Sequence, residues 1–292
     1  MNFDTYLQQQ FKSSTQQGIQ RTVHEYTQWC VAMHVEAPQA TYSELLDYMK
    51  HCASKGHKTT TVNRKINNLH HYFNWLKHEN KRADSPLLNV RLRNATRLLP
   101  CEALPYDSIE KLYTSYEAHT LLALRNKTMI GLMVYQGLNS SELVALEVKD
   151  IKLEEGTIYI PSTRRSNSRV LKLEAKQILG LQNYILTTRL ALIKESSSNS
   201  SIDSSKLFVF KGVSKSVHNH FHGLLLQLQQ LNSGVKKLEQ LRVSVLAHWY
   251  KHHHSREVQY RIGHKYVSST ERYRTDKLES LQEQLEKIHP MR

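Results

Sequence analysis

The sequence predicts a mainly α-helical protein of two domains, in which the second domain adds a small antiparallel β-hairpin to its helices. Three observations support this class. A chain of 292 residues is long for one core and comfortable for two. Its ten glycines and six prolines are few, which favours helices. Apolar residues recur at spacings of three and four along most of the chain, and only two stretches are typical of strands.

Residues 1–90 are expected to form a helical N-terminal domain. Apolar periodicity predicts helices over 15–35 and 59–80, and Thr41 followed by Glu44 marks the start of another helix between them. The helix over 59–80 is apolar on one face and basic on the other. From Lys55 to Arg97 the chain has ten Lys and Arg residues against two acidic ones. Such a face is either simply solvated or directed at a polyanion.

The rest of the chain is expected to be a linker, 91–105, and a second domain, 106–292. Helices are predicted from a cap at Asp107-Ser108, over Leu121–Tyr135, from a capping box at Asn139-Ser-Ser-Glu142, and from residue 216 onward. The two strand-like stretches are Gly156–Ile160 and Arg169–Leu173, joined by a basic turn. A serine-rich tract over 196–205 is expected to be a loop.

Composition narrows the class of partner. A net charge of +14 and a pI near 9.6 favour a nucleic acid, although a basic but inert surface is the alternative. No apolar run is long enough to span a bilayer, and the N-terminus lacks the layout of a signal peptide. Three widely spaced cysteines are typical of reduced thiols in a cytosolic protein. We therefore expect a cytoplasmic, nucleoid-associated protein.

The last eighth of the chain carries the residues of greatest chemical interest. Arg242, a Gly263-His264 pair and Tyr273 follow one another in a helical stretch, the tyrosine nine residues after the histidine. A guanidinium binds phosphate oxygens bidentately and stays charged at any working pH. A phenol can take a phosphate onto itself and so divide one difficult step into two. This set suits phosphoryl transfer through a tyrosine, although with fifteen tyrosines in the chain a purely structural Tyr273 is the alternative.

These segments resemble a known family. Residues 241–242, 262–264 and 270–273 are similar to the C-terminal signature of the tyrosine recombinase (phage integrase) family, and 135–143 is similar to its first conserved box. The resemblance implies a helical, SAM-like N-terminal DNA-binding domain and a catalytic domain of helices with a small β-hairpin. It also implies a site-specific recombinase of a mobile element, acting through a 3′-phosphotyrosine at Tyr273, with Arg242 and His264 at the phosphate.

Three positions depart from the family pattern. Asn139 stands where the first arginine is expected, Arg164 where the hairpin lysine is expected, and Glu239 where a histidine is expected. Asparagine is a neutral donor and also a good N-cap. An arginine releases a proton far less readily than a lysine, and a carboxylate can accept the phenol's proton but repels a phosphate. Another arginine reaching the site would restore the missing charge, and the candidates are Arg165, Arg261 and Arg272.

The resemblance also implies the partners. Duplex DNA is expected to contact a set of basic residues: Lys58, Arg64, Lys65, Arg91, Arg93, Arg97 and Arg165. An amphipathic tail helix over 276–288 is expected to join protomers into a dimer or tetramer on DNA, with docking onto its own domain as the alternative.

No cofactor or metal is expected, since the phosphotyrosine conserves the energy of the broken bond. Histidine clusters at 218–222 and 248–254 lack partners at the spacing of a structural zinc site. The rival function is a DNA-binding accessory protein on the same fold that no longer cuts.

Overall fold

The computed structural model describes residues 2–87, 90–92, 101–163, 166–196, 204–210 and 214–273. Several sequence-based expectations lie outside these residues: Arg93, Arg97, Arg164, Arg165 and the tail helix over 276–288. The chain divides into two compact units, Met1–Leu98 and Leu99–Arg292. The finer division into 1–90, a linker and 106–292 stays a prediction.

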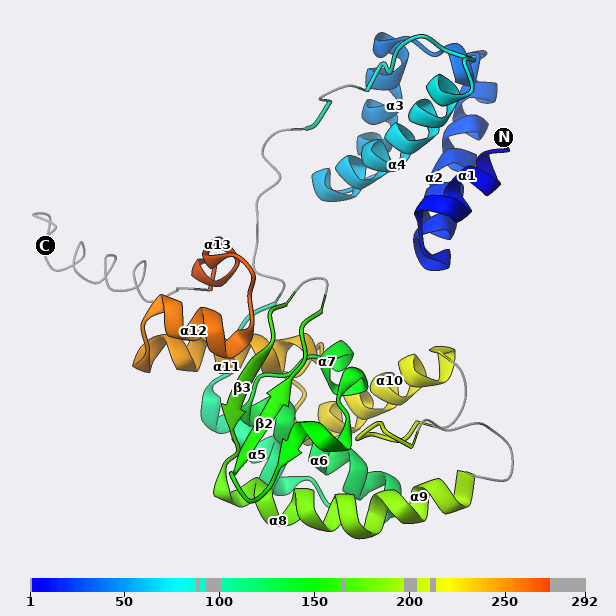
Figure 1. Ribbon diagram of the computed structural model, residues 1–292. Coiled ribbons are helices and arrows are strands. Elements are labelled where there is room, and N and C mark those ends of the chain that lie inside the picture. The colour runs from blue at the N-terminus through cyan, green and yellow to red at the C-terminus, as the bar shows by residue number, and fades with distance from the viewer. Residues whose placement is uncertain are drawn as a thin grey trace, which may run out of the picture. The chain divides into compact units, whose positions relative to one another are not determined.

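The N-terminal unit is helical (Figure 1). It contains α1 (Phe3–Gln10), α2 (Ser13–Ala32), a short 3₁₀ helix η1 (Ala37–Gln39), α3 (Tyr42–Ser54) and α4 (Thr59–His78). The predicted apolar face of α4 is buried against α2 and α3, with Ile66 and Phe73 at most 2% exposed. Helix α3 begins as the sequence predicts, because Thr41 and Glu44 cap each other in a capping box.

The C-terminal unit is built around one helix, α6. Before the sheet come α5 (Tyr106–Ser115), α6 (Leu121–Tyr135), α7 (Ser140–Ala145) and the 3₁₀ helix η2 (Val148–Asp150). After it come α8 (Ala175–Asn183), a π-helical turn η3 (Tyr184–Thr188), α9 (Arg189–Ser196), α10 (Ser214–Leu231), α11 (Glu239–His252), α12 (Ser255–Ile262) and α13 (Val267–Glu271). Helix α6 is mostly apolar, is buried from Met129 to Tyr135, and is in contact with α5, α8, α9 and α11.

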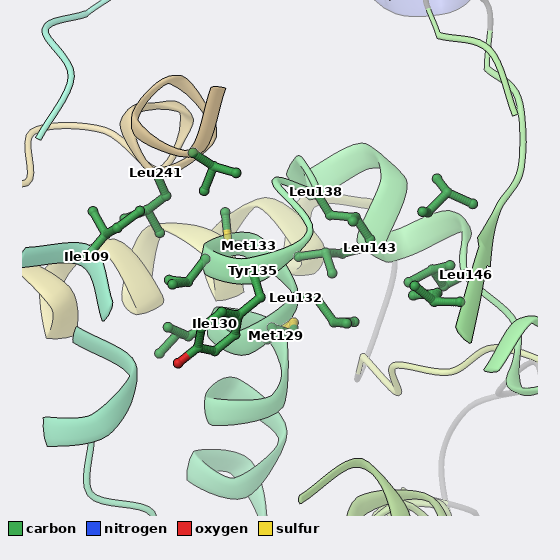
Figure 2. Close-up of a cluster of buried hydrophobic side chains, with 14 of the residues drawn as sticks. Ile109, Met129, Ile130, Leu132, Met133, Tyr135, Leu138, Leu143, Leu146 and Leu241 are labelled. Atoms are coloured by element: carbon green, nitrogen blue, oxygen red, sulfur yellow. The ribbon is translucent and has the colours of Figure 1, made fainter. Parts of the chain in front are cut away.

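Figure 2 shows this core from the side of α6. Met129, Ile130, Leu132 and Met133 of α6 lie between Leu138, Leu143 and Leu146 on one side and Ile109 and Leu241 on the other, and all are at most 2% exposed. The core therefore fixes the end of α6, the whole of α7 and the first turn of α11 relative to one another. Two of these segments, α7 and α11, carry Glu142 and Arg242.

The sheet is small and antiparallel, in the order β1–β2–β3. Strands β2 (Thr157–Ile160) and β3 (Arg169–Lys172) are the two predicted strands, and the two-residue β1 (Ile151–Lys152) was missed because it is too short to show periodicity. Ile160 is paired with Arg169 in the register, and both side chains are on the buried face. One predicted cap was wrong: α5 begins at Tyr106 after Pro105, so Asp107 lies in the first turn instead of preceding it.

Candidate active site

Helices α11, α12 and α13 gather beside β3 at one end of the C-terminal unit (Figure 1), and the candidate residues lie among them. Tyr273 comes two residues after α13 and is 8% exposed. Burial raises the pKa of its phenol, opposed by the charge of Arg272, while Glu239 raises it further. The guanidinium of Arg272 lies 5.7 Å from the centre of the Tyr273 ring. Tyr273 therefore keeps its proton at neutral pH until a base receives it.

His264 is held beside Tyr273 by a turn that needs glycine. Helix α12 ends at Gly263, whose φ of 75° lies in the left-handed region that favours glycine. The Nδ1 atom of the next residue, His264, lies 2.9 Å from the hydroxyl oxygen of the fully buried Thr270. The ring centres of His264 and Tyr273 are 6.2 Å apart. The predicted pair of His264 and Tyr273 is therefore one cluster.

The imidazole of His264 is neutral at ordinary pH. Burial lowers its pKa, and the positive charges of Arg242, Arg272 and Arg169 lower it further, to about 4. In the tautomer in which Thr270 donates to Nδ1, the Nε2 atom carries the proton. His264 then offers a neutral N–H donor, which suits a phosphate oxygen.

Arg242 ties three segments together from its place on α11. Its Nη1 donates to the carbonyl oxygen of Gly137 at 2.6 Å, and its Nη2 donates to that of Ile262 at 2.6 Å. Nη1 also donates to Oε2 of Glu142 at 2.8 Å. Glu142, and not Glu239 three residues earlier on the same helix, is its ionic partner among the described residues. Glu239 is exposed in the first turn of α11.

Asn139 has a structural role in this part of the chain. It is the N-cap of α7: its side chain accepts from the N–H of Glu142 at 2.9 Å, and its own N–H donates back to Glu142 at 3.0 Å. This confirms the capping box predicted from the sequence. The side-chain oxygen of Asn139 is therefore occupied by the backbone of its own helix.

Glu142 is the centre of the site, and the sequence showed only its capping role. It is 1% exposed, and its second oxygen, Oε1, accepts from Nη1 of Arg169 at 2.8 Å. Burial raises the pKa of the Glu142 carboxyl, but Arg242 and Arg169 more than offset this, so that the pKa is lowered. One buried carboxylate therefore joins two guanidiniums.

Arg169 is the site residue that sequence reasoning missed. It is 2% exposed on β3 and faces inward with Ile160 and Leu171. A signal was present: in a strand that alternates, a charged residue in phase with an inward-facing leucine is itself directed inward. Arg261, one of the arginines expected to reach the site, instead pairs with Glu257 at 2.7 Å on an exposed helix face.

The turn between β2 and β3 is hydrogen-bonded to the segment that carries His264. Ser166 forms an isolated β-bridge with His264, and the N–H of Asn167 donates to the carbonyl of Gly263 at 2.9 Å. On the other side of the turn, the N–H of Thr163 donates to the carbonyl of Ser166 at 2.9 Å. Thr163 and Ser166 are thus hydrogen-bonded to each other, and Ser166 is bridged to His264.

Basic residues of the N-terminal unit differ in their availability. Lys58, Arg64 and Arg91 are exposed. The ammonium group of Lys65 instead pairs with Glu25 at 2.7 Å, and its side chain is 13% exposed. Lys65 therefore has less free charge than the other three.

Among the described residues no group of histidine, cysteine and acidic side chains is arranged to hold a metal, and no helix is long and apolar enough to cross a bilayer.

The buried neutral His264 predicts a pH dependence of stability. Its folded pKa of about 4 lies below the ordinary value of 6.5, so the unfolded chain binds the extra proton first and stability is lost as pH falls between these values. We expect the wild-type protein to lose about 2 kcal/mol more than His264→Gln between neutral pH and about pH 5. Urea unfolding at several pH values measures this, with the exposed His254→Gln as control. Identical pH profiles of wild type and His264→Gln would contradict it.

The sequence has relatives among characterised proteins. The sequence profile of the phage integrase family matches residues 102–279. Tyrosine recombinase XerD of Listeria monocytogenes serotype 4b (strain F2365) is 25% identical over 259 residues, which cover 85% of this chain and 82% of that protein. XerD of Halalkalibacterium halodurans is 25% identical over 274 residues, which cover 89% of this chain and 86% of that protein.

Solved structures share the fold. The Tn1549 transposon integrase in complex with circular intermediate DNA has a TM-score of 0.67 at 15% identity, over 97% of this chain and 98% of that one. The lambda integrase dimer bound to a core site has a TM-score of 0.63 at 14% identity, over 94% and 93%. The profile spans more than half of the chain and includes Arg242, His264 and Tyr273. The chain therefore belongs to the phage integrase family of tyrosine recombinases.

Proposed function

We propose that this protein is a site-specific DNA recombinase that breaks and rejoins duplex DNA through a 3′-phosphotyrosine at Tyr273. The observation that carries the proposal is that the buried Tyr273 and the half-buried His264 and Arg242 form one cluster. Tyr273 lies 6.2 Å from His264 between ring centres, and Arg242 binds the carbonyl of Ile262, two residues before His264. The residues that match the family's nucleophilic tyrosine, its histidine and its second arginine thus lie close together.

The reaction follows from these groups. The Tyr273 phenol oxygen forms a bond to the scissile phosphorus, the bond from phosphorus to the 5′ oxygen breaks, and the phenol loses its proton. Glu239 accepts that proton: its charge raises the pKa of Tyr273, so it lies within electrostatic reach. The 5′ oxygen takes a proton from water, because Arg164 holds its own above about pH 12 and stabilises the leaving oxygen only by its charge. A 5′ hydroxyl of the partner strand then displaces the tyrosine.

Arg242 and His264 stabilise the charge that develops on the phosphate. The guanidinium is charged throughout, and the neutral Nε2–H of His264 donates to a non-bridging oxygen. Both groups are held in advance by the hydrogen bonds of the free protein, so little reorganisation is needed when the phosphate arrives.

Covalent capture tests the proposal. A pool of duplexes with randomised sequence, each carrying a nick, traps any 3′-phosphotyrosine, because a strand cleaved just upstream of the nick loses the short fragment that bears the new 5′ hydroxyl. Protein–DNA adducts that survive denaturing electrophoresis are expected with the wild-type protein, and sequencing their DNA gives the recognition site. The absence of adducts, with the protein folded and bound to DNA, would contradict the proposal.

A second function is favoured by one observation. Asn139 occupies the position of the family's first arginine and is committed to capping α7. A site with one guanidinium fewer is what a DNA-binding accessory or regulatory protein on this fold would have. The capture experiment separates the two functions, because an accessory protein binds DNA and forms no adduct.

The exposed basic residues of the N-terminal unit are proposed to contact DNA phosphates. Arg64→Ala should weaken binding to all sequences and reduce the slope of log K against log salt by roughly 0.9, the contribution of one phosphate contact. Lys65→Ala should change the slope less, because Glu25 already balances that charge. Fluorescence anisotropy with a labelled duplex at several salt concentrations measures both slopes. Arg21→Ala, an exposed arginine outside the basic stretch, is the control. Equal slopes for Arg64→Ala and wild type would place the DNA surface elsewhere.

Assembly and context complete the proposal. The tail helix over 276–288 is proposed to join protomers into a dimer or tetramer on DNA in the cytoplasm, at the nucleoid. A chain that lacks residues 277–292 should then bind single sites normally and fail to bind paired sites cooperatively. An insoluble truncated protein would mean that the helix belongs to its own domain.

We also assign the protein to a mobile element, which inverted repeats in the DNA that flanks its gene would support.

A further inference from the structure

Arg169 is a buried cation whose hydrogen-bonding capacity is only partly used. Its side chain has no exposed surface, and Nη1 donates to Oε1 of Glu142 at 2.8 Å. The Nε and Nη2 atoms are buried without a hydrogen-bond partner among the described residues. Buried donors are nearly always paired, so a guanidinium with two free donors requires an explanation. In a medium of low dielectric constant, the field of its positive charge extends farther than it would in water.

The guanidinium lies directly under the backbone that presents His264. A side chain at Gly263 would collide with Nη1 of Arg169, and its Cβ would stand 3.0 Å from Cζ. The charge of Arg169 is one of those that lower the pKa of His264. Arg169 is therefore close enough to act on the group that meets the phosphate.

The charges of the buried cluster do not balance. Glu142 is one carboxylate, and it accepts from Arg169 and Arg242 at 2.8 Å each. One net positive charge is left in the interior, and such a charge is costly unless an anion meets it. Asn139 contributes no charge, because it is neutral and caps α7.

The other arginines near the site are less suited to this task. Arg261 is neutralised by Glu257 at 2.7 Å, and Arg272 is exposed and lies over the ring of Tyr273. Arg165 lies outside the described residues. Within the described part of the site, Arg169 is the buried guanidinium that adds to Arg242.

We propose that Arg169 is a positioning residue that supplies the second positive charge of the scissile-phosphate site, which Asn139 does not supply, acting through Glu142 and the Gly263–His264 backbone. The idea rests on the proposed recombinase function. It explains how a site without the family's first arginine keeps a net positive charge next to the phosphate, since Arg169 and Arg242 share the one carboxylate of Glu142.

Adduct formation gives the first test. On a nicked duplex from the capture experiment, Arg169→Met is expected to form adduct roughly 10- to 100-fold more slowly than wild type. Arg169→Lys, which keeps the charge, should recover most of the rate. Arg125→Met is the matched control: Arg125 is also buried, also has an unpartnered Nε, and binds the carbonyl of Val209 away from the site. A rate for Arg169→Met equal to that of wild type would overturn the proposal.

A neutral substrate separates charge from structure. When the scissile phosphate is replaced by an uncharged methylphosphonate, the defect of Arg169→Met should shrink, because there is less negative charge to stabilise. A purely structural role leaves the defect unchanged and would overturn the proposal.

Restoring the arginine elsewhere gives a further readout. Asn139→Arg should raise the rate of Arg169→Met and should not raise the rate of the wild-type protein, which already has its second charge.

A DNA-free measurement keeps this inference distinct from the proposed function. The pKa of His264, followed by NMR of its ring protons, should rise in Arg169→Met and stay at the wild-type value in Arg125→Met. If the wild-type protein makes no adduct, the recombinase proposal fails, while a raised pKa of His264 still supports Arg169 as a charge at this site. An unchanged pKa of His264 in folded Arg169→Met would overturn the inference whatever the chemistry.

Discussion

Tyr273→Phe is expected to bind duplex DNA with wild-type affinity and to form no covalent adduct. The substitution removes one oxygen and leaves a ring of the same shape in a site that is 8% exposed, so the packing beside His264 is preserved. Only the atom that bonds to phosphorus is lost, and no neighbouring group replaces it. Denaturing electrophoresis on the nicked duplex measures the adduct, and anisotropy on the same duplex measures binding.

Two other tyrosines serve as matched controls. Tyr266 and Tyr260 lie close in sequence and are 71% and 53% exposed, and the hydroxyl of Tyr260 accepts from the N–H of Val170 at 3.1 Å. Tyr266→Phe and Tyr260→Phe should form adduct at close to the wild-type rate. An adduct that persists in Tyr273→Phe and disappears in either control would make that tyrosine the nucleophile and remove the basis of the proposed site.

The sequence predicted the parts of this site that depend on local order. The Gly263-His264 pair was recognised because its two residues are adjacent, and the structure adds that Gly263 ends α12 in the left-handed region and so sets the direction of His264. The capping box of Asn139 and Glu142 can be recognised because its two partners are three residues apart. Helix α6 was predicted at its observed bounds because apolar residues dominate it and Gly137 follows its end.

Contacts between distant segments could not be predicted in the same way. Glu142 binds Arg242 one hundred residues later and Arg169 twenty-seven residues later. No periodicity relates these positions, and a sequence offers Arg242 a nearer carboxylate in Glu239. The fold decides between the two carboxylates, because Glu142 of α7 is buried in contact with Arg242 of α11, whereas Glu239 is exposed. The identity of the ionic partners is therefore a property of the tertiary structure.

The role of Asn139 was open in the sequence, since an asparagine at a helix start serves either as a cap or as a donor to a ligand. The structure shows the cap. A second positive charge at the site must therefore come from a residue other than Asn139. In this chain the second guanidinium next to Glu142 comes from a strand, and strand register, which pairs Arg169 with Ile160, is what brings it there.

Glu142→Ala is expected to destabilise the C-terminal unit by roughly 3–5 kcal/mol, because it leaves two buried guanidiniums without their shared counter-charge. Glu142 is 1% exposed, and both of its oxygens accept from arginines at 2.8 Å. Loss of the carboxylate also removes half of the capping box of α7. Urea unfolding of the full chain measures the change. Trp249 is the one tryptophan of this unit, so replacing Trp29 and Trp75 by phenylalanine makes its fluorescence report on this unit alone.

Two variants decide whether the loss comes from the charge. Glu239→Ala removes an exposed carboxylate from the start of α11 and should change the free energy of unfolding by no more than about 0.5 kcal/mol. Glu142→Gln keeps the shape and two polar atoms but not the charge, and should fall between Glu142→Ala and wild type. If Glu142→Ala were as stable as Glu239→Ala, the arginines would not depend on this carboxylate. Their charges would then have another partner, and the account of a site with one uncompensated positive charge would have to be abandoned.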